Sequence, residues 1–341
     1  MIVIFLESSP MRILVIQLRQ LGDILLTTPC SRALRSHYPN AEIDFLCHPM
    51  GKKILSGNSD ISEILTYGES LTEQITCAIK LYKKRYDLIF DFMNNPRSAL
   101  LTFLAQAKNS VAFASSRNFF YKTIINKSSE LQYIVNEKFL LLESFGIPCG
   151  EIQLILPTSE RDRLFAADFL GRLKNKKEKR LIIISPTSKR DVRLWALENF
   201  VALATNLIRE HHAEIIWLWG PGEESTIDTA MQLCPELSIK APKTTFAQMC
   251  ALMQCCDLFI GGTNGPSHVA VAAKLPSLQL HGPTYARSWS PLNISHRAIS
   301  ASGNPDKLSA DLNAITLDDV LSVLKDFWPT IDARKKELEN C

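Results

Sequence analysis

Apolar runs and helical patterns alternate along the first part of the chain. Residues 12–17 centre on an apolar run typical of a strand buried on both faces, and residues 21–37 then carry apolar side chains at helical spacing. The alternation continues with predicted strands at 41–47, 61–67 and 87–93, and with predicted helices at 71–85 and 98–107. Strands and helices in this order predict a parallel sheet covered by helices on both faces.

A second alternation follows residues 146–157, a segment with two prolines and two glycines. Its predicted strands are 181–185, 214–219, 238–240, 257–260 and 277–280, and its predicted helices are 197–210, 223–233, 245–256 and 267–273. The fold class that follows is α/β, with two Rossmann-like, doubly wound parallel-sheet domains facing a central cleft. The domains are expected at 11–155 and 156–325, with a terminal helical segment, 326–341, that packs back toward the first domain. Open α/β sheets bind ligands at the carboxyl ends of their strands, so the cleft is the predicted site.

Composition agrees with two globular domains. The chain has 341 residues, 46% hydrophobic and 21% charged, which excludes extended disorder. Its net charge is only +3, and basic residues cluster at 80–85 and 174–180. Solvated helix faces or loops explain such clusters, so no nucleic-acid partner is expected; contact with an anionic lipid headgroup or a phosphorylated sugar stays open.

Cysteine usage and hydropathy indicate the compartment. The nine cysteines include no C-x-x-C pair, which predicts reduced thiols in a cytoplasmic protein. Residues 1–10 lack the basic start and the apolar length of a signal peptide, and are interpreted as an extension outside the fold. No apolar stretch reaches the roughly 18 residues of a membrane span.

The first candidate site residue is Asp23, which follows the opening strand at the start of the predicted helix. Gly22 permits a close backbone approach there. One interpretation is a carboxylate that caps the helix and is stabilised by its dipole. The other is a general base at the mouth of the cleft.

A glycine turn around Gly220 and Glu223 ends one strand and opens a helix in the second half. Glycine allows close contact with a nucleotide, and an acid just beyond can accept hydrogen bonds from ribose hydroxyls. An ordinary turn followed by acids at a helix start is the alternative, because the third glycine of a dinucleotide fingerprint is missing.

The most informative segment leaves the strand at 257–260 and enters a helix near Pro266. Backbone N–H groups, the positive helix end and two hydroxyls together favour binding of a diphosphate over a plain glycine-rich connection. The residues predicted to bind there are Gly262, Thr263, Asn264, Gly265, Pro266, Ser267 and His268.

A hydroxyl-rich and basic segment follows the strand at 181–185. Its candidate residues are Thr187, Ser188, Lys189 and Arg193, although a surface loop has the same composition. Hydroxyls and cations can hold a phosphate leaving group, and arginine can do so with two parallel hydrogen bonds. No two aspartates lie two residues apart, so the D-x-D clamp that binds a divalent metal on a nucleotide is missing, and neither a metal nor a cofactor is expected.

Taken in order, these motifs resemble glycosyltransferase family 9, the ADP-heptose:lipopolysaccharide heptosyltransferases of Gram-negative bacteria. The resemblance covers residues 11–327. It is carried by Arg12–Ile16, Leu21–Ile24, Thr28–Pro29, Pro186–Ser188 with Trp195, Trp219–Glu223, Gly265–Ala272, Pro276 and His281–Thr284.

The resemblance implies a GT-B fold and a metal-independent reaction that inverts the anomeric carbon. Asp23 matches the family's catalytic base, and Glu223 matches the acid that binds the adenosine portion of the donor. Thr187 and Ser188 match residues that contact the donor diphosphate, and Arg193 stands where the family often has a lysine. Thr263 departs from the family pattern, whose aspartate contacts the donor sugar, which leaves the identity of the sugar open.

The expected function is transfer of a heptose or related sugar from a nucleoside diphosphate, ADP-heptose by resemblance, to the lipopolysaccharide inner core. The expected partners are that donor and the core acceptor, with peripheral contact to the inner face of the inner membrane. Two alternatives stay open: a sugar-nucleotide 2-epimerase, which would act on the donor alone, and a non-catalytic sugar-nucleotide binder.

Overall fold

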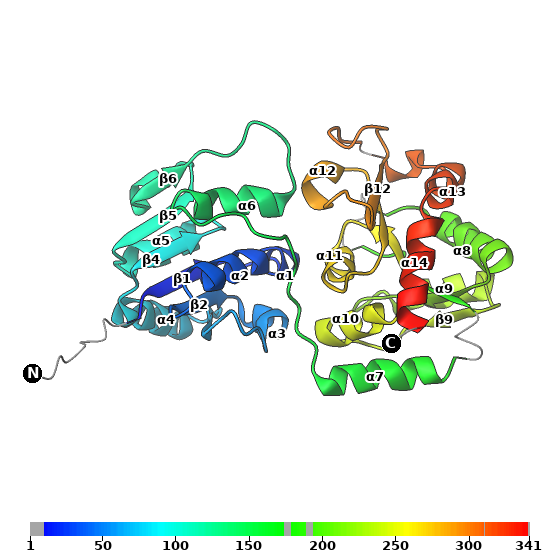
Figure 1. The fold of residues 1–341 in the computed structure, drawn as a ribbon, viewed down its shortest axis with the longest axis horizontal. Helices are drawn as coiled ribbons and strands as arrows, with labels where there is room; N and C mark the ends of the chain where they lie inside the picture. Colours follow the sequence, from blue (N-terminus) through cyan, green and yellow to red (C-terminus); the bar gives the residue numbers. More distant parts are fainter. Residues whose placement is uncertain (1–9, 174–178, 189–193, 310, 340–341) are drawn as a thin grey trace, which may run out of the picture. The chain divides into compact units, whose positions relative to one another are not determined.

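The computed structural model describes residues 10–173, 179–188, 194–309 and 311–339. The chain divides into two compact units. The first comprises residues 1–130 and 134–157, and the second comprises residues 131–133 and 158–341. Figure 1 colours them along the sequence, with the first unit in blue to green and the second in green to red.

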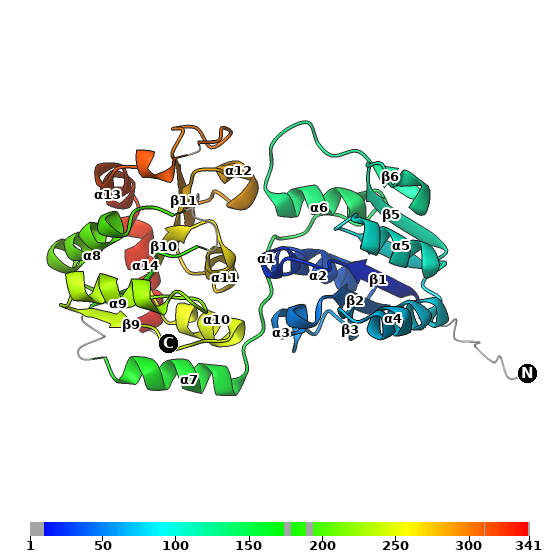
Figure 2. The same ribbon diagram turned by 180° about the vertical axis from the view of Figure 1, so that it is seen from behind.

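A six-stranded parallel sheet forms the first unit, in the order β3-β2-β1-β4-β5-β6. Its strands are β1 (Arg12–Ile16), β2 (Glu42–Cys47), β3 (Glu63–Thr66), β4 (Leu88–Asp91), β5 (Asn109–Phe113) and β6 (Thr123–Ile125). Its helices are α1 (Leu21–Leu25), α2 (Thr28–His37), α3 (Lys52–Leu55), α4 (Leu71–Lys84), α5 (Pro96–Leu104) and α6 (Ile134–Glu143), with short 3-10 turns η1 (Pro49–Gly51) and η2 (Asn118–Phe120). Helix α6 lies beside α2, as Figures 1 and 2 show.

The predicted helix at 21–37 is two helices in the structure. Pro29 lies in the first turn of α2 and has no N–H to donate to the carbonyl of Leu25. The hydroxyl of Thr28 donates to that carbonyl instead, over 2.7 Å, so the chain turns before α2 begins.

The second unit repeats the strand order of the first. Its parallel sheet runs β12-β11-β10-β7-β8-β9, which is the same 3-2-1-4-5-6 arrangement when its strands are numbered within the unit. The strands are β7 (Arg180–Ser185), β8 (Ala213–Trp217), β9 (Ser238–Lys240), β10 (Leu258–Gly262), β11 (Ser277–His281) and β12 (His296–Ser300). The helices are α7 (Glu160–Gly171), α8 (Leu197–His211), α9 (Glu224–Leu233), α10 (Phe246–Gln254), α11 (Gly265–Ala272), α12 (Ala286–Trp289), α13 (Leu317–Lys325) and α14 (Trp328–Glu339), with a 3-10 turn η4 (Leu312–Ala314).

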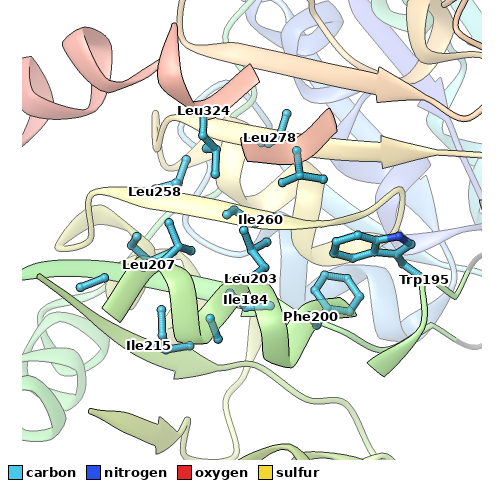
Figure 3. Packing of buried hydrophobic residues seen from close by; sticks show 14 of the residues in the cluster. Ile184, Trp195, Phe200, Leu203, Leu207, Ile215, Leu258, Ile260, Leu278 and Leu324 are labelled. Carbon is cyan, nitrogen blue, oxygen red and sulfur yellow. The ribbon is translucent and has the colours of Figure 1, made fainter. Parts of the chain in front are cut away.

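The core of the second unit lies between its sheet and α8, α9 and α13. Ile184 and Ile260 from neighbouring strands meet Leu203 of α8, and Trp195 and Phe200 close one end of the cluster (Figure 3). The Trp195 indole is buried and donates its N–H to the carbonyl of Ile315 over 2.8 Å, so even its polar atom is satisfied.

Helix α14 contacts the second unit. Ile331 is fully buried in the core of that unit, and Arg180 of β7 pairs with Asp332 over 2.7 Å. Packing of residues 326–341 toward the first domain therefore stays a prediction. Among the described helices, none has the length and apolar character that crossing a membrane requires.

Candidate functional site

The two sheets share one topological feature, a reversal of strand order. The chain winds outward in one direction from β1 and in the other from β4, and it does the same from β7 and β10. Because all these strands are parallel, loops that follow the two central strands diverge and leave a crevice at the carboxyl edge. The candidate residues are therefore expected at the carboxyl edge of each sheet.

In the second unit, hydrogen bonds join the loops that follow β7, β8 and β10. The Thr187 hydroxyl donates to Glu223 Oε2 over 2.5 Å, and the Gly220 N–H donates to the same oxygen over 2.7 Å. From the third loop, the Asn264 side-chain amide donates to the Thr187 carbonyl over 3.2 Å. Four predicted donor-binding residues, up to 77 positions apart in sequence, are thus brought together.

Gly220 leaves little room for a side chain beside Glu223. A Cβ at this position would lie 3.0 Å from Glu223 Oε2, the oxygen that the backbone N–H of Gly220 itself contacts. The turn closes at Gly222, whose φ of +88° is a left-handed conformation that side chains rarely adopt. Because the Thr187 hydroxyl donates its hydrogen to Glu223, it offers only lone pairs to any other group.

The helix α11 begins at this junction. Asn264 is its N-cap and accepts from the Ser267 N–H over 3.2 Å, while the Ser267 hydroxyl donates back to the Asn264 carbonyl over 2.8 Å. Gly265 and Pro266 form the first turn, as the sequence predicted. This end of the helix carries positive partial charge, and Gly262 at the end of β10 leads directly into it.

The approach of β10 to β7 depends on Gly261. A Cβ at this position would lie 3.0 Å from the backbone carbonyl oxygen of Ser185 and 3.0 Å from the Phe259 ring. A side chain there would push the two central strands apart just before the loops that carry Thr187 and Asn264.

Thr263 is tied into a buried polar network that sequence analysis did not predict. Its hydroxyl lies 2.9 Å from His281 Nδ1, and His281 Nε2 lies 3.0 Å from the Ser290 hydroxyl. Ser290 in turn donates to Gln279 Oε1 over 2.8 Å, and the Thr284 hydroxyl completes the cluster around the imidazole. The departure from the family aspartate is therefore matched by hydroxyl and imidazole partners. The motif containing His281 was the only signal for it in the sequence.

His268 is buried one turn into α11, with 4% of its surface exposed. Burial lowers its pKa to about 4, so the ring is neutral at pH 7. Its Nδ1 atom has no hydrogen-bond partner among the described residues, and Trp289 lies with its ring centroid 6.1 Å away. Buried polar atoms are rarely left unpaired, which makes this nitrogen a candidate contact for a bound molecule.

In the first unit, Asp23 lies at the third position of α1, after the carboxyl end of β1. It is half-buried, and its Oδ2 accepts from the Gln20 N–H over 3.2 Å, which is the capping interaction that the sequence allowed. The carboxylate is therefore not enclosed by packing. Its role as a base stays a prediction.

Lys138 of α6 supports the loop that carries Asp23. Its ammonium group, on a residue only 5% exposed, donates to Gln17 Oε1 over 2.9 Å. The Gln17 side-chain amide donates to the Arg19 carbonyl one residue before the Gln20 cap. Burial lowers the pKa of Lys138, whereas the nearby Asp23 charge raises it. Sequence analysis missed this lysine because it did not predict α6.

A small pocket opens at the same carboxyl edge of the first sheet. Its cationic or titratable lining is Arg19, His48 and Arg97, and its other lining residues are Leu18, Tyr67, Gly68, Met93 and Asn95. Glu69 lies 3.3 Å from Arg19 and 3.6 Å from His48, whereas the described structure gives Arg97 no ion pair. Such a lining favours an anionic ligand group.

Three other predictions have different outcomes. Ser188 is partly buried beside Thr187. Lys189 and Arg193 lie outside the described residues, so their role stays a prediction. Among the residues that are described, no group of three or more His, Cys, Asp and Glu side chains could hold a metal ion.

Two doubly wound domains, each with its polar loops at the carboxyl edge and one with a helix terminus for an anion, define the class of nucleotide-sugar enzymes with a GT-B fold. The sequence profile of Glycosyltransferase family 9 (heptosyltransferase) matches residues 76–313, and the chain belongs to this family. It is thus a glycosyltransferase, as the motifs predicted.

Individual relatives agree with this assignment. Lipopolysaccharide heptosyltransferase 3 of Escherichia coli is 26% identical over 337 residues, covering 91% of this chain and 97% of the relative. Among solved structures, a family 9 glycosyl transferase from Veillonella parvula aligns with a TM-score of 0.83 at 20% identity, covering 93% of this chain and 97% of the other. The E. coli heptosyltransferase WaaC with ADP-2-deoxy-2-fluoro heptose aligns with a TM-score of 0.72 at 19% identity, covering 93% and 99%. These likenesses confirm the fold.

Proposed function

We propose that this enzyme transfers a heptose from ADP-heptose to the inner core of lipopolysaccharide. The observation that carries the proposal is the joining of Thr187, Glu223 and Asn264 at the start of α11. The helix end there offers backbone N–H groups to a diphosphate, while the Glu223 carboxylate and the Thr187 lone pairs can accept from a ribose or base. The relative WaaC was solved with an ADP-linked fluoro-heptose, which supports the same donor class.

The donor would lie with its diphosphate at Asn264–Ser267 and its adenosine portion at Glu223. A carboxylate close to a ribose can accept from its hydroxyls, and the Gly220 N–H already orients the Glu223 carboxylate. His268, buried in α11 and neutral, would neither repel nor attract the charge of the donor. In this arrangement the buried network around Thr263 would determine the shape of the part of the site that receives the donor sugar.

Asp23 is the proposed base. It would take the proton of an acceptor hydroxyl while that oxygen attacks the anomeric carbon, and the bond from this carbon to the ADP oxygen would break. Attack from the side opposite the leaving group inverts the anomeric carbon. The helix end, together with Lys189 and Arg193 by family resemblance, would offset the charge of departing ADP without a metal.

The acceptor would use the first unit. Arg19, His48 and Arg97 at the carboxyl edge fit anionic groups of an oligosaccharide core. A lipid-linked acceptor would place the enzyme in the cytoplasm, at the inner face of the inner membrane.

Comparing two carboxylate variants tests the proposal. Asp23→Asn keeps the shape of the side chain but removes the base, so kcat with ADP-heptose should fall by about 10²–10⁴-fold. Its Kd for ADP should stay unchanged, because the donor residues lie in the second unit. Asp87→Asn, before the amino end of β4, is the matched control and should keep its activity.

Full activity of Asp23→Asn would refute the assignment of the base. Incubation of the wild-type enzyme with donor alone distinguishes transfer from the epimerase alternative, because an epimerase would isomerise the donor without any acceptor. A donor that stays unchanged until acceptor is added supports transfer. Binding of ADP without turnover on any heptose acceptor would leave only the non-catalytic binder.

A further inference from the structure

One face of the first unit exposes an unusual number of large apolar side chains. Among the described residues, eight of the sixteen exposed large hydrophobic side chains lie on α4, α5 and η2. They are Leu71, Ile75, Ile79, Tyr82, Leu100, Phe103, Leu104 and Phe119. Scattered apolar residues are normal on a protein surface, but a concentration on neighbouring elements indicates an interaction site.

The four apolar residues of α4 form one stripe. Leu71, Ile75, Ile79 and Tyr82 follow one another at spacings of four, four and three, which places them on one side of a helix. The opposite side buries Cys77 and Leu81 in the core. Helix α4 is therefore apolar on both sides, and its core contacts account for only one of them.

The stripe continues onto neighbouring elements. Helix α4 contacts α5, and α5 contacts η2. The Phe103 ring of α5 lies 5.8 Å from that of Phe120, which lies 4.1 Å from that of Phe119. Phe119, 75% exposed, is the outermost of these rings. We call the eight exposed side chains on these three elements the α4–α5 face.

Charges around the α4–α5 face are mostly positive. The three elements contain a single acid, Glu73, in the first turn of α4. Lys80, Lys83 and Lys84 lie at the other end of α4, and Arg85 follows them. Lys80 and Lys84 pair with Glu63, whereas Lys83 and Arg85 make no ion pair with a carboxylate in the described part of the chain.

We propose that the α4–α5 face is a docking surface for an anionic lipid bilayer. Apolar side chains bordered by lysine and arginine fit the boundary between acyl chains and negatively charged headgroups. A contact with a second copy of the chain is the alternative occupant, and sedimentation velocity distinguishes it below. The inference rests on the proposed function, because a bilayer contact is useful to the enzyme only if its acceptor is linked to a lipid.

Vesicle co-sedimentation tests the surface without donor or acceptor. Wild-type protein should bind vesicles of phosphatidylglycerol and phosphatidylethanolamine, and should bind phosphatidylcholine vesicles more weakly. The pair Ile75→Glu and Ile79→Glu should reduce binding at least about tenfold, because each glutamate replaces inserted apolar area with a like charge. The pair Lys83→Gln and Arg85→Gln should reduce it about fivefold for each charge removed.

Matched controls place equal charge on apolar sites elsewhere. Leu164→Glu and Ile294→Glu change exposed side chains of the second unit and should leave vesicle binding unchanged. Thermal unfolding of every variant checks that it is folded, and transfer to a delipidated acceptor in solution should be unchanged in the Ile75/Ile79 pair. That last assay separates failure of the surface from failure of the proposed reaction.

Three results would overturn the inference. The first is that wild-type protein does not sediment with anionic vesicles, and the second is that the control variants lose binding as much as the Ile75/Ile79 pair. Sedimentation velocity gives the third result, a wild-type dimer that the same pair converts to a monomer while vesicle binding persists. The α4–α5 face would then be the interface with a second copy of the chain.

Discussion

The two units share one strand order but carry different chemistry at the carboxyl edge. In the first unit this edge holds the Asp23 carboxylate, the buried Lys138 ammonium group and a pocket lined with arginine. In the second, it holds glycines, hydroxyls, a helix terminus and the neutral imidazole of His268. Topology therefore determines where each site forms, and the loop residues determine which ligand it suits.

Their buried polar groups differ in the same way. The first unit buries charge, with Asp44 accepting from Lys84 over 2.6 Å and from the Tyr86 hydroxyl over 2.7 Å. The second unit also buries carboxylates, but it adds the imidazoles His281 and His296, which hydrogen-bond to hydroxyls. The predictions below separate the units by stability, by pH and by ligand affinity.

The largest expected effect is on stability of the second unit. Trp195→Ala should lower its free energy of unfolding by about 3–5 kcal/mol, because it removes a large buried ring and leaves the Ile315 carbonyl without its donor. Calorimetry should show an earlier transition for this unit alone. Leu233→Ala, at an exposed site of α9, should change it by less than about 0.5 kcal/mol. Equal shifts in both units would mean that they unfold as one.

Acid should destabilise the second unit selectively. Burial lowers the pKa of His268 and of His296 to about 4 from the ordinary 6.5, so the unfolded chain binds more protons between these values. Stability should be fully present above pH 6.5 and fall as the pH approaches 4, by on the order of 3 kcal/mol for each histidine.

Denaturant titrations at several pH values measure this slope. His296→Gln should remove about half of it, while the first unit, whose His37 and His48 are not buried, should show no matching loss from histidine. A slope that is unchanged in His296→Gln would show that other groups cause the loss.

A smaller effect is expected where β10 meets β7. Gly261→Val keeps a residue suited to strands but adds atoms against the Ser185 carbonyl, which should cost about 1–3 kcal/mol and weaken ADP binding. Gly171→Ala, at the end of α7 where a Cβ meets nothing within 4 Å, is the control and should be neutral or stabilising. Unchanged ADP affinity in Gly261→Val would mean that strand spacing does not shape the donor site.

The smallest effect concerns one carboxylate oxygen. Glu223→Gln should weaken ADP binding about 3–10-fold, because an amide cannot accept from Thr187, Gly220 and a ribose as a carboxylate does. Glu224→Gln, the adjacent exposed acid, should bind ADP as the wild type does, and titration calorimetry can compare the two. Equal affinities for all three proteins would remove Glu223 from the donor site.

Much of the fold could be predicted because its central strands are continuous apolar runs. The predicted strands at 12–17, 41–47 and 181–185 each match an observed strand to within one residue or two. Three strands were not predicted, namely β5, β6 and β12, of which β12 is largely polar. The edge strands β3 and β9 were predicted, at 61–67 and 238–240. Helix α6 was missed, and with it the lysine that supports the loop before Asp23.

The candidate site likewise contains a part that local sequence predicts and a part that it does not. Residues 262–268 could be predicted because they are consecutive and carry their own signal, a strand end followed by a helix start. The bond from Thr187 to Glu223 joins residues 36 apart, and that from Thr263 to His281 joins residues 18 apart. Such pairs depend on which strands are neighbours, and local pattern does not contain this information.

Asn264 shows what a single neutral side chain can do at such a place. Its side-chain oxygen caps the start of α11, and its side-chain nitrogen donates to the Thr187 carbonyl in the neighbouring loop. Aspartate would cap the helix equally well, but it would place a negative charge beside the proposed diphosphate site and could not donate to the Thr187 carbonyl as the amide does. With the neutral amide, this position adds no second negative charge to that of the nearby Glu223 carboxylate, so the positive end of α11 is not offset further.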